Sequence, residues 1–183
     1  MHRDVIIGAR WADLPETSAR HNVHVAVSSL RTHLERILPG RGRQLLIRDG
    51  LSYVFAPKSE SVTDLQKFQR RLAEATQSRH AGDRTTQAEA LRAALDLYVD
   101  EVLPADGSAE WLLPARDRHR QSAAEASDLL ARLELDRGHV AEAVHVAQRS
   151  VEIDPWRDAS WRTLIEAHRA AGDPASAERA KRQ

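Results

Sequence analysis

Short polar side chains recur along one segment that arginines flank. His24, Ser28 and Thr32 are spaced four residues apart, so in a helix they would share one face. The arginines of this segment are Arg20, Arg31 and Arg36. Imidazole and hydroxyl groups can hydrogen-bond base edges in the major groove of DNA, and guanidinium groups can bind phosphates. An ordinary amphipathic helix with a solvated polar face would show the same spacing, so both interpretations stay open.

The polar row needs a helix to position it, and the apolar residues predict one over residues 19–38. They recur at intervals of four, three, four and three, at Val23, Val27, Leu30, Leu34 and Ile37. Thr17 or Ser18 is expected to cap this helix, and Pro39 with Gly40 is expected to end it. A shorter helix is predicted over residues 3–11.

After this helix the pattern changes from helix to strand. Residues 44–48 and 51–55 are β-prone, and Asp49-Gly50 between them is a strong signal for a β-hairpin. Arg48 would lie near the tip of the hairpin, where it could bind the phosphate backbone, and Arg41 and Arg43 lead into the first strand. A plain surface hairpin with solvated arginines is the alternative.

Charge is distributed unevenly along the chain of 183 residues. Its net charge is zero, yet residues 1–57 hold eight arginines against five acidic residues, which permits contact with nucleic acid at this end. The chain has no cysteine, which excludes disulfides and thiolate metal sites. No apolar run approaches the roughly 20 residues that span a bilayer, and no secretory signal is evident. A cytoplasmic protein without membrane contact is expected.

Catalytic and metal-binding patterns are absent from the sequence. His21 and His24 could share a helix face, but no third ligand stands at suitable spacing, so no metal site is expected, and the remaining histidines are expected on the surface or in packing. There is no Gly-rich phosphate loop, nucleophile elbow or His-Glu-x-x-His pair. The sequence therefore predicts no enzyme and no cofactor.

The second part of the chain is predicted to be helical throughout. Breaks between its helices are expected at Gly82-Asp83, Pro104 to Ser108, Gly138, Asp154-Pro155 and Gly172-Asp173. Leu130, Gly138, Ala141 and Ala143 recur 34 residues later as Leu164, Gly172, Ala175 and Ala177, the period of tetratricopeptide repeats. Two clear repeats and a degenerate one around Gly82 are expected, with Trp111, Trp156 and Trp161 in packing roles.

Several motifs together resemble a known family. Trp11-Ala12-Asp13, the run from Ala19 to Arg31, and the hairpin with Arg48-Asp49-Gly50 and Tyr53 resemble the second half of an OmpR-type winged helix. Further matches are Asp64-Leu65-x-x-Phe68, Leu97-Tyr98 to Leu103-Pro104, Glu110-Trp111 and the Gly138 repeat, which resemble a bacterial transcriptional activation domain. In this order they resemble the actinobacterial antibiotic regulatory proteins.

The resemblance implies a mainly α fold with two domains. Residues 1–57 would form a partial winged helix of two helices plus a β-hairpin, truncated at its N-terminal side, because the family's domain opens with a sheet and a first helix. Residues 62–183 would form a tetratricopeptide-like repeat domain, with the boundary at residues 57–61.

The function that the resemblance implies is transcriptional activation. The helix and wing would bind promoter DNA through Arg20, His24, Ser28, Arg31, Thr32, Arg36 and Arg48. The repeats would contact RNA polymerase or a second protomer in a homodimer. The alternative is a protein-interaction or adaptor module whose degenerate winged helix does not bind DNA.

Overall fold

The structure is a computed structural model that describes residues 1–56, 63–107 and 109–183. The described residues form two compact units, which divide between Val62 and Thr63. The predicted boundary at residues 57–61 lies outside the described residues, so the predicted domain limits of 1–57 and 62–183 stay predictions.

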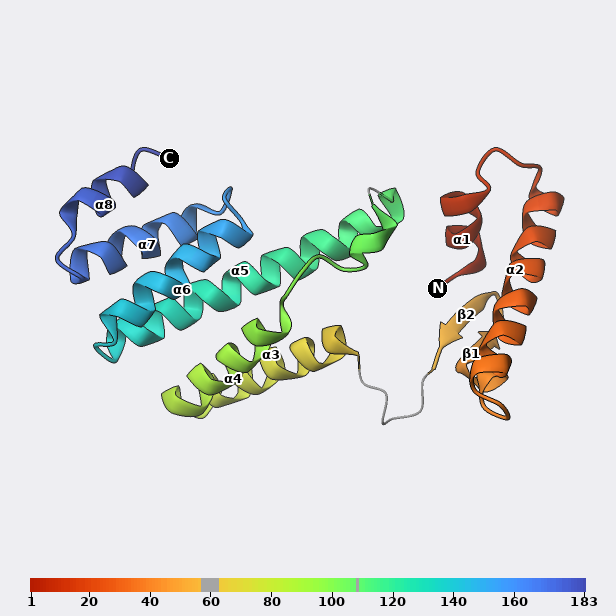
Figure 1. Cartoon of the computed structure of the whole chain (residues 1–183), viewed down its shortest axis with the longest axis horizontal. Helices are drawn as coiled ribbons and strands as arrows, with labels where there is room; N and C mark the ends of the chain where they lie inside the picture. The colour runs from red at the N-terminus through yellow and green to blue at the C-terminus, as the bar shows by residue number, and fades with distance from the viewer. Residues whose placement is uncertain (57–62, 108) are drawn as a thin grey trace. The chain divides into compact units, whose positions relative to one another are not determined.

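The N-terminal unit consists of two helices and a two-stranded sheet (Figure 1). Its elements in order are α1 (Arg3–Arg10), α2 (Glu16–Ile37), the 3-10 helix η1 (Gly42–Leu45), β1 (Leu46–Asp49) and β2 (Ser52–Phe55). The predicted start of the long helix is wrong. It begins at Glu16 after Pro15, without a side-chain cap, so neither Thr17 nor Ser18 caps it. Pro15 is the N-cap residue, and its ring fixes its φ, which is −53° here.

The hairpin is antiparallel, but its first strand begins two residues later than predicted and its second strand one residue later. Leu46 pairs with Phe55 and Asp49 pairs with Ser52, so Gly50 and Leu51 make the turn. Gly50 has a φ of +56°, a conformation that glycine adopts without steric cost. Gln44 and Leu45, expected in the first strand, belong to η1 instead. The N-terminal residues add to this sheet, because the backbone N–H of Tyr53 donates to the carbonyl oxygen of Met1 at 2.9 Å.

A small apolar core holds the N-terminal unit together. Val23, Leu46 and Tyr53 are buried, and the partly buried side chains around them are those of Ile6, Ile7, Trp11, Val27 and Leu34. Two members of the predicted apolar face of α2 lie outside this core, because Leu30 is 46% exposed and Ile37 is 59% exposed. The helix is longer than the two short strands and α1 that cover it.

The C-terminal unit is a stack of helix pairs. Its α-helices are α3 (Asp64–His80), α4 (Arg84–Leu97), α5 (Leu113–Asp136), α6 (Val140–Ile153), α7 (Asp158–Ala170) and α8 (Pro174–Ala180). Gly82, Gly138 and Gly172 turn α3 into α4, α5 into α6 and α7 into α8, each with a φ between +72° and +79°. These turns are three of the helix breaks that the sequence predicts. The predicted break from Pro104 to Ser108 includes Ser108, which lies outside the described residues.

The core of the C-terminal unit runs through the stacked pairs, because each pair buries its apolar face against the next one. Leu130 and Leu164, the 34-residue equivalents, are 1% and 6% exposed. The predicted fold class is therefore confirmed: the chain is mainly α, with a partial winged helix followed by tetratricopeptide-like helix pairs.

The tryptophans of the C-terminal unit do not share one role. Trp161 packs against the core, and its indole N–H donates to the carbonyl oxygen of Pro155 at 2.8 Å. Trp156 is 90% exposed, so the expectation that it packs is wrong. It lies in the turn after α6, where no neighbouring helix covers it. No helix in the described part of the chain is both long and apolar enough to cross a membrane.

Candidate nucleic-acid interface

A hollow of about 430 Å³ lies between α2 and the hairpin of the N-terminal unit. Five of the residues that the sequence singles out line it: His24, Ser28, Arg31, Thr32 and Arg48. The remaining lining residues are Val27, Arg43 and Tyr53. The fold thus brings the polar row of the helix and the arginine of the hairpin onto one concave surface.

Helix α2 presents its polar row here because its opposite face is held in the core. Val23 is 1% exposed and Ala19 is fully buried, which orients the helix about its axis. His24, Ser28 and Thr32 are exposed on the other side. The hydroxyl of Thr32 donates to the backbone carbonyl oxygen of Ser28 at 3.0 Å, which fixes its rotamer while its oxygen keeps lone pairs to accept a further bond.

Arg31 links the helix to the hairpin. Its Nε and Nη2 atoms donate to the backbone carbonyl oxygen of Leu46 at 3.0 Å and 2.8 Å. The guanidinium group therefore serves the local structure as well as the hollow. Because it keeps further N–H donors, it can still face an anion in the hollow.

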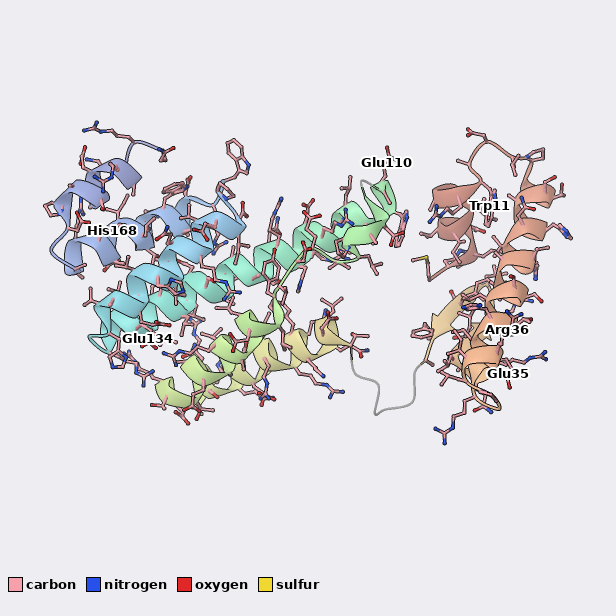
Figure 2. The ribbon with its side chains drawn as sticks, viewed as in Figure 1. Trp11, Glu35, Arg36, Glu110, Glu134 and His168 are labelled. Atoms are coloured by element: carbon pink, nitrogen blue, oxygen red, sulfur yellow. The ribbon has the colours of Figure 1, made fainter. Side chains whose placement is uncertain are left out.

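The loop that carries Arg43 is held by a carboxylate. Glu35 accepts hydrogen bonds from the backbone N–H groups of Gly40 and Arg43, the second at 3.0 Å. These bonds, that of Arg43 first, hold the pKa of the Glu35 carboxyl below its ordinary value. Figure 2 shows Glu35 and its neighbour Arg36 near the C-terminal end of α2. Glu35 thus positions the loop that brings Arg43 to the hollow.

Arg43 was not among the predicted site residues, although the sequence places it just before the first strand. Arg43 lines the hollow because η1 turns the chain back onto α2 at Gly42, which is buried. A Cβ atom at Gly42 would lie 2.1 Å from the carbonyl carbon of Leu34. A glycine two residues before a predicted strand is a weak signal for such a close approach.

Two predicted residues lie outside the hollow. Arg20 forms an ion pair with Glu16 one helical turn earlier, and Arg36 is exposed on α2. Neither side chain lines the hollow, so any phosphate that they bind would lie beside it. Arg48 lines it from the hairpin, and its Nε donates to the carbonyl oxygen of Gly50 at 3.0 Å.

The electrostatic character of the hollow favours an anion. Three arginines and no carboxylate line it. In the described residues, Arg43 and Arg48 form no ion pair with an acidic side chain, so both charges are available to a ligand. Over the same residues no three His, Cys, Asp or Glu side chains lie close enough together to hold a metal ion. Phosphate oxygens and base edges fit this set of donors.

The helical unit matches a known domain. The sequence pattern of the bacterial transcriptional activator domain covers residues 63–182, from the first residue of the C-terminal unit almost to its last. The chain belongs to the family of the bacterial transcriptional activator domain. The resemblance seen in the sequence is thereby confirmed at this level.

A solved structure resembles the whole chain. It is Mycobacterium tuberculosis EmbR in complex with a low-affinity phosphopeptide, with a TM-score of 0.81 and 22% sequence identity. The whole of the present chain aligns with it, and the alignment spans 48% of that EmbR chain. At this identity the likeness shows the fold, including the N-terminal helices and hairpin. No curated protein matches the chain.

Proposed function

We propose that this chain is the DNA-binding and activating part of a transcription regulator of the actinobacterial antibiotic-regulatory type. In this proposal α2 is the recognition helix of an OmpR-type winged helix, and the β1–β2 hairpin is its wing. The observation that supports it most is the hollow that joins three arginines to the polar row of α2. The membership of the helical unit in the activator-domain family agrees with it.

In this proposal the side chains of the hollow make two kinds of contact with DNA, to phosphates and to base edges. Arg43 and Arg48 bind phosphates, because their guanidinium groups face the hollow without an acidic partner among the described residues. His24, Ser28 and Thr32 reach base edges in the major groove, because they are exposed on one face of α2. Arg31 holds the wing against the helix and adds positive charge. Arg20 and Arg36 bind phosphates beside the hollow.

The helical unit has the second role in this proposal. Stacked helix pairs present extended surfaces to other proteins. In a regulator bound at a promoter, such a surface contacts RNA polymerase or a second protomer of a homodimer. The family match over residues 63–182 supports this assignment of the unit.

DNA binding by the full chain tests the first role. The experiment measures fluorescence anisotropy of a labelled random-sequence duplex pool at about 50 mM and about 200 mM salt. We expect a loss of affinity of about 10-fold or more at the higher salt, and a log–log salt slope that is smaller by about 2 for the Arg43→Ala, Arg48→Ala double variant. The matched control is Arg10→Ala, since Arg10 is exposed in the same unit and does not line the hollow.

One group of observations favours the adaptor alternative. The N-terminal unit exposes large apolar side chains, among them Ile37 at 59% and Phe55 at 58%. Apolar side chains that lie together on a surface are typical of contacts with other protein. An adaptor would show no affinity for DNA at either salt concentration, and the double variant would then behave like the wild type. That result would overturn the DNA-binding proposal.

A further inference from the structure

A glutamine occupies a position where the other two helix pairs have alanine. Gln87, Ala143 and Ala177 each lie five residues after the turn glycine of their pair. Ala143 is fully buried and Ala177 is 4% exposed. Gln87 is 3% exposed, so its larger and polar side chain is buried as completely as the two methyl groups. The first pair therefore encloses a carboxamide where the later pairs enclose only a methyl group.

The buried carboxamide has no partner in the protein. Within the described residues the Gln87 side chain makes no hydrogen bond. Its polar atoms are not sealed off, because the unpaired side-chain atoms that are fully enclosed in this part of the chain belong to His119, Arg120, Ser127 and Arg157. Gln87 lines a hollow of about 260 Å³, so its amide opens into that space. An unpaired carboxamide in apolar surroundings is costly, and a ligand in the hollow would supply the missing bonds.

This hollow lies where the first and second helix pairs meet, and we call it the inter-pair pocket. α7 packs directly against α5, whereas α3 reaches α5 mainly through α4. α4 contributes Gln87 and Leu91 to the lining, and α3 and α5 contribute the other lining residues. Three helices therefore surround the carboxamide, and a ligand in the inter-pair pocket would contact all three.

Much of the pocket lining is aliphatic. Its apolar members are Leu72, Ala75, Leu91, Ala126 and Leu129, all of which are buried or partly buried in the core of the helical unit. Sites for small molecules are typically apolar with a few polar groups that orient the ligand. The volume of about 260 Å³ is below the roughly 300–1,000 Å³ of sites for drug-sized ligands, so a smaller compound fits.

The charges of the lining do not select a ligand. The ionisable lining residues are all exposed and carry both signs: Arg79, His80 and Glu125. Water and salt screen exposed charges. The hydroxyls of Thr76 and Ser122 also line the pocket, and a hydroxyl can act as donor or acceptor. Selection therefore depends on the Gln87 amide, which offers one acceptor and two donors.

We propose that the inter-pair pocket binds a small aliphatic compound that carries a primary carboxamide or a lactam group. Such a group has an N–H donor and a carbonyl acceptor on one edge, as the Gln87 amide has, so two hydrogen bonds can form between them. The aliphatic part of the ligand lies against the leucines. This site goes beyond the proposed DNA binding and does not depend on it, so the two proposals can fail separately.

Two compounds of the same shape test the proposal on the full chain. Isocaproamide carries the carboxamide, and methyl isoamyl ketone has a methyl group in place of its NH₂ group. Nuclear magnetic resonance titration, read at the backbone N–H signals, gives both affinities. We expect a Kd of about 1–10 mM for the carboxamide, as is ordinary for so small a ligand. The ketone should bind at least about 10-fold more weakly, because it leaves the carbonyl oxygen of Gln87 without a donor.

The shifted signals should belong to the segments that line the pocket, residues 72–80, 87–91 and 122–129. Equal affinities of the two compounds, shifts confined to other parts of the chain, or no binding of the carboxamide at about 50 mM would overturn the proposal. Because both compounds are compared on the wild-type chain, this result does not depend on any variant.

Gln87→Met removes the carboxamide and keeps the length of the side chain. This variant should bind both compounds equally, whereas Gln77→Met should keep the wild-type preference, because Gln77 is exposed on α3 and does not line the pocket. Thermal unfolding verifies that both variants fold. Gln87→Met should unfold at the same temperature as the wild type or a higher one, because the unpaired carboxamide is gone. A preference for the carboxamide that persists in Gln87→Met would contradict the proposal.

A third probe separates free compounds from proteins, because glutamine and asparagine side chains carry the same carboxamide. The probe is a tripeptide with blocked ends and glutamine between two alanines. We expect it to bind more weakly than isocaproamide, because the pocket is small and its lining is largely aliphatic. Tighter binding of the tripeptide would mean that a side chain of another protein occupies the pocket, and the proposal of a small-molecule ligand would then be wrong.

Discussion

The guanidinium group of Arg31 donates two hydrogen bonds to the backbone carbonyl oxygen of Leu46, from Nε at 3.0 Å and from Nη2 at 2.8 Å. The two residues belong to α2 and to the first position of β1. This contact therefore sets the distance between the polar row of the helix and the arginine of the hairpin. A residue that the sequence suggests as a phosphate ligand also builds the surface on which the other ligands lie.

Replacing Arg31 by lysine should weaken the junction of helix and hairpin. A lysine ammonium group cannot reproduce the forked pair of N–H donors, so we expect a loss of about 1 kcal/mol in the free energy of unfolding for Arg31→Lys. DNA affinity should fall as well, although the positive charge is kept. Urea unfolding and anisotropy measure the two effects. If Arg31→Lys matched the wild type in both, Arg31 would act by charge alone.

Gly42 should tolerate no side chain. A Cβ atom there would lie 2.1 Å from the carbonyl carbon and 2.2 Å from the backbone nitrogen of successive residues of α2, and backbone atoms cannot rotate away. We expect Gly42→Ala to destabilise the N-terminal unit by about 3 kcal/mol, at the upper end for overpacking. Amide hydrogen exchange of α2 measures this effect.

Gly8→Ala is the matched control for the Gly42 variant. Gly8 lies within α1, and nothing lies within 4 Å of a Cβ atom built there. Alanine in a helix interior is more favourable than glycine by about 0.5–1 kcal/mol, so this variant should exchange more slowly. Faster exchange in both variants, by the same factor, would mean that the close approach at Gly42 is not the cause.

Glu134 should make the stability of the helical unit sensitive to acid. Its side chain, labelled in Figure 2, is fully buried. Its carboxylate lies 2.8 Å from Arg92, 3.1 Å from Arg137 and 2.6 Å from the Nδ1 of His139. Burial by itself raises the pKa of this carboxyl, but the hydrogen bond with His139 and the two guanidinium groups outweigh burial and lower the pKa below 4.5. Because the pKa is lowered on folding, the contribution to stability is present above pH 4.5 and is lost as the pH falls through the folded-state value.

Glu134→Gln tests this dependence. At neutral pH we expect a loss of about 1.5–3 kcal/mol in the free energy of unfolding, the range for hydrogen bonds to charged groups. The difference from the wild type should shrink as the pH falls below 4.5. Asp136→Asn is the control, since Asp136 lies on the same helix as Glu134 and pairs with Arg84 of α4 at the exposed surface. A constant difference between pH 7 and pH 3, about either side of the ordinary carboxyl pKa, would contradict the assignment.

The contact between α7 and α5 should depend on the Thr163 hydroxyl. It donates to the buried carboxylate of Asp128 and accepts from Nε of Arg132 at 3.1 Å. Thr163→Val keeps the shape of the side chain and removes both bonds, so we expect a loss of about 1–3 kcal/mol. A double-mutant cycle with Asp128→Asn measures the coupling by urea unfolding. Additive effects of the two changes would show that the hydroxyl and the carboxylate do not interact in solution.

Periodicity in the sequence determined the elements and their order. The interval of apolar residues predicted α2, the Asp49-Gly50 pair predicted the hairpin, and the 34-residue recurrence around Gly138 and Gly172 predicted the helix pairs. These signals are local, because the spacing of side chains along a helix or a strand follows from backbone geometry alone. The polar row of His24, Ser28 and Thr32 could be recognised for the same reason.

Tertiary packing decided what local spacing cannot express. Ile37 fits the apolar period of α2 and is nevertheless exposed, because the covering elements are shorter than the helix. Arg43 reaches the hollow only because Gly42 lets η1 touch the backbone of α2. Arg162 and Asp128 occupy equivalent repeat positions, and only the stacking of helices leaves one exposed and buries the other. Burial of a residue depends on which other elements pack against it. The sequence of one segment does not specify which distant segments will cover it.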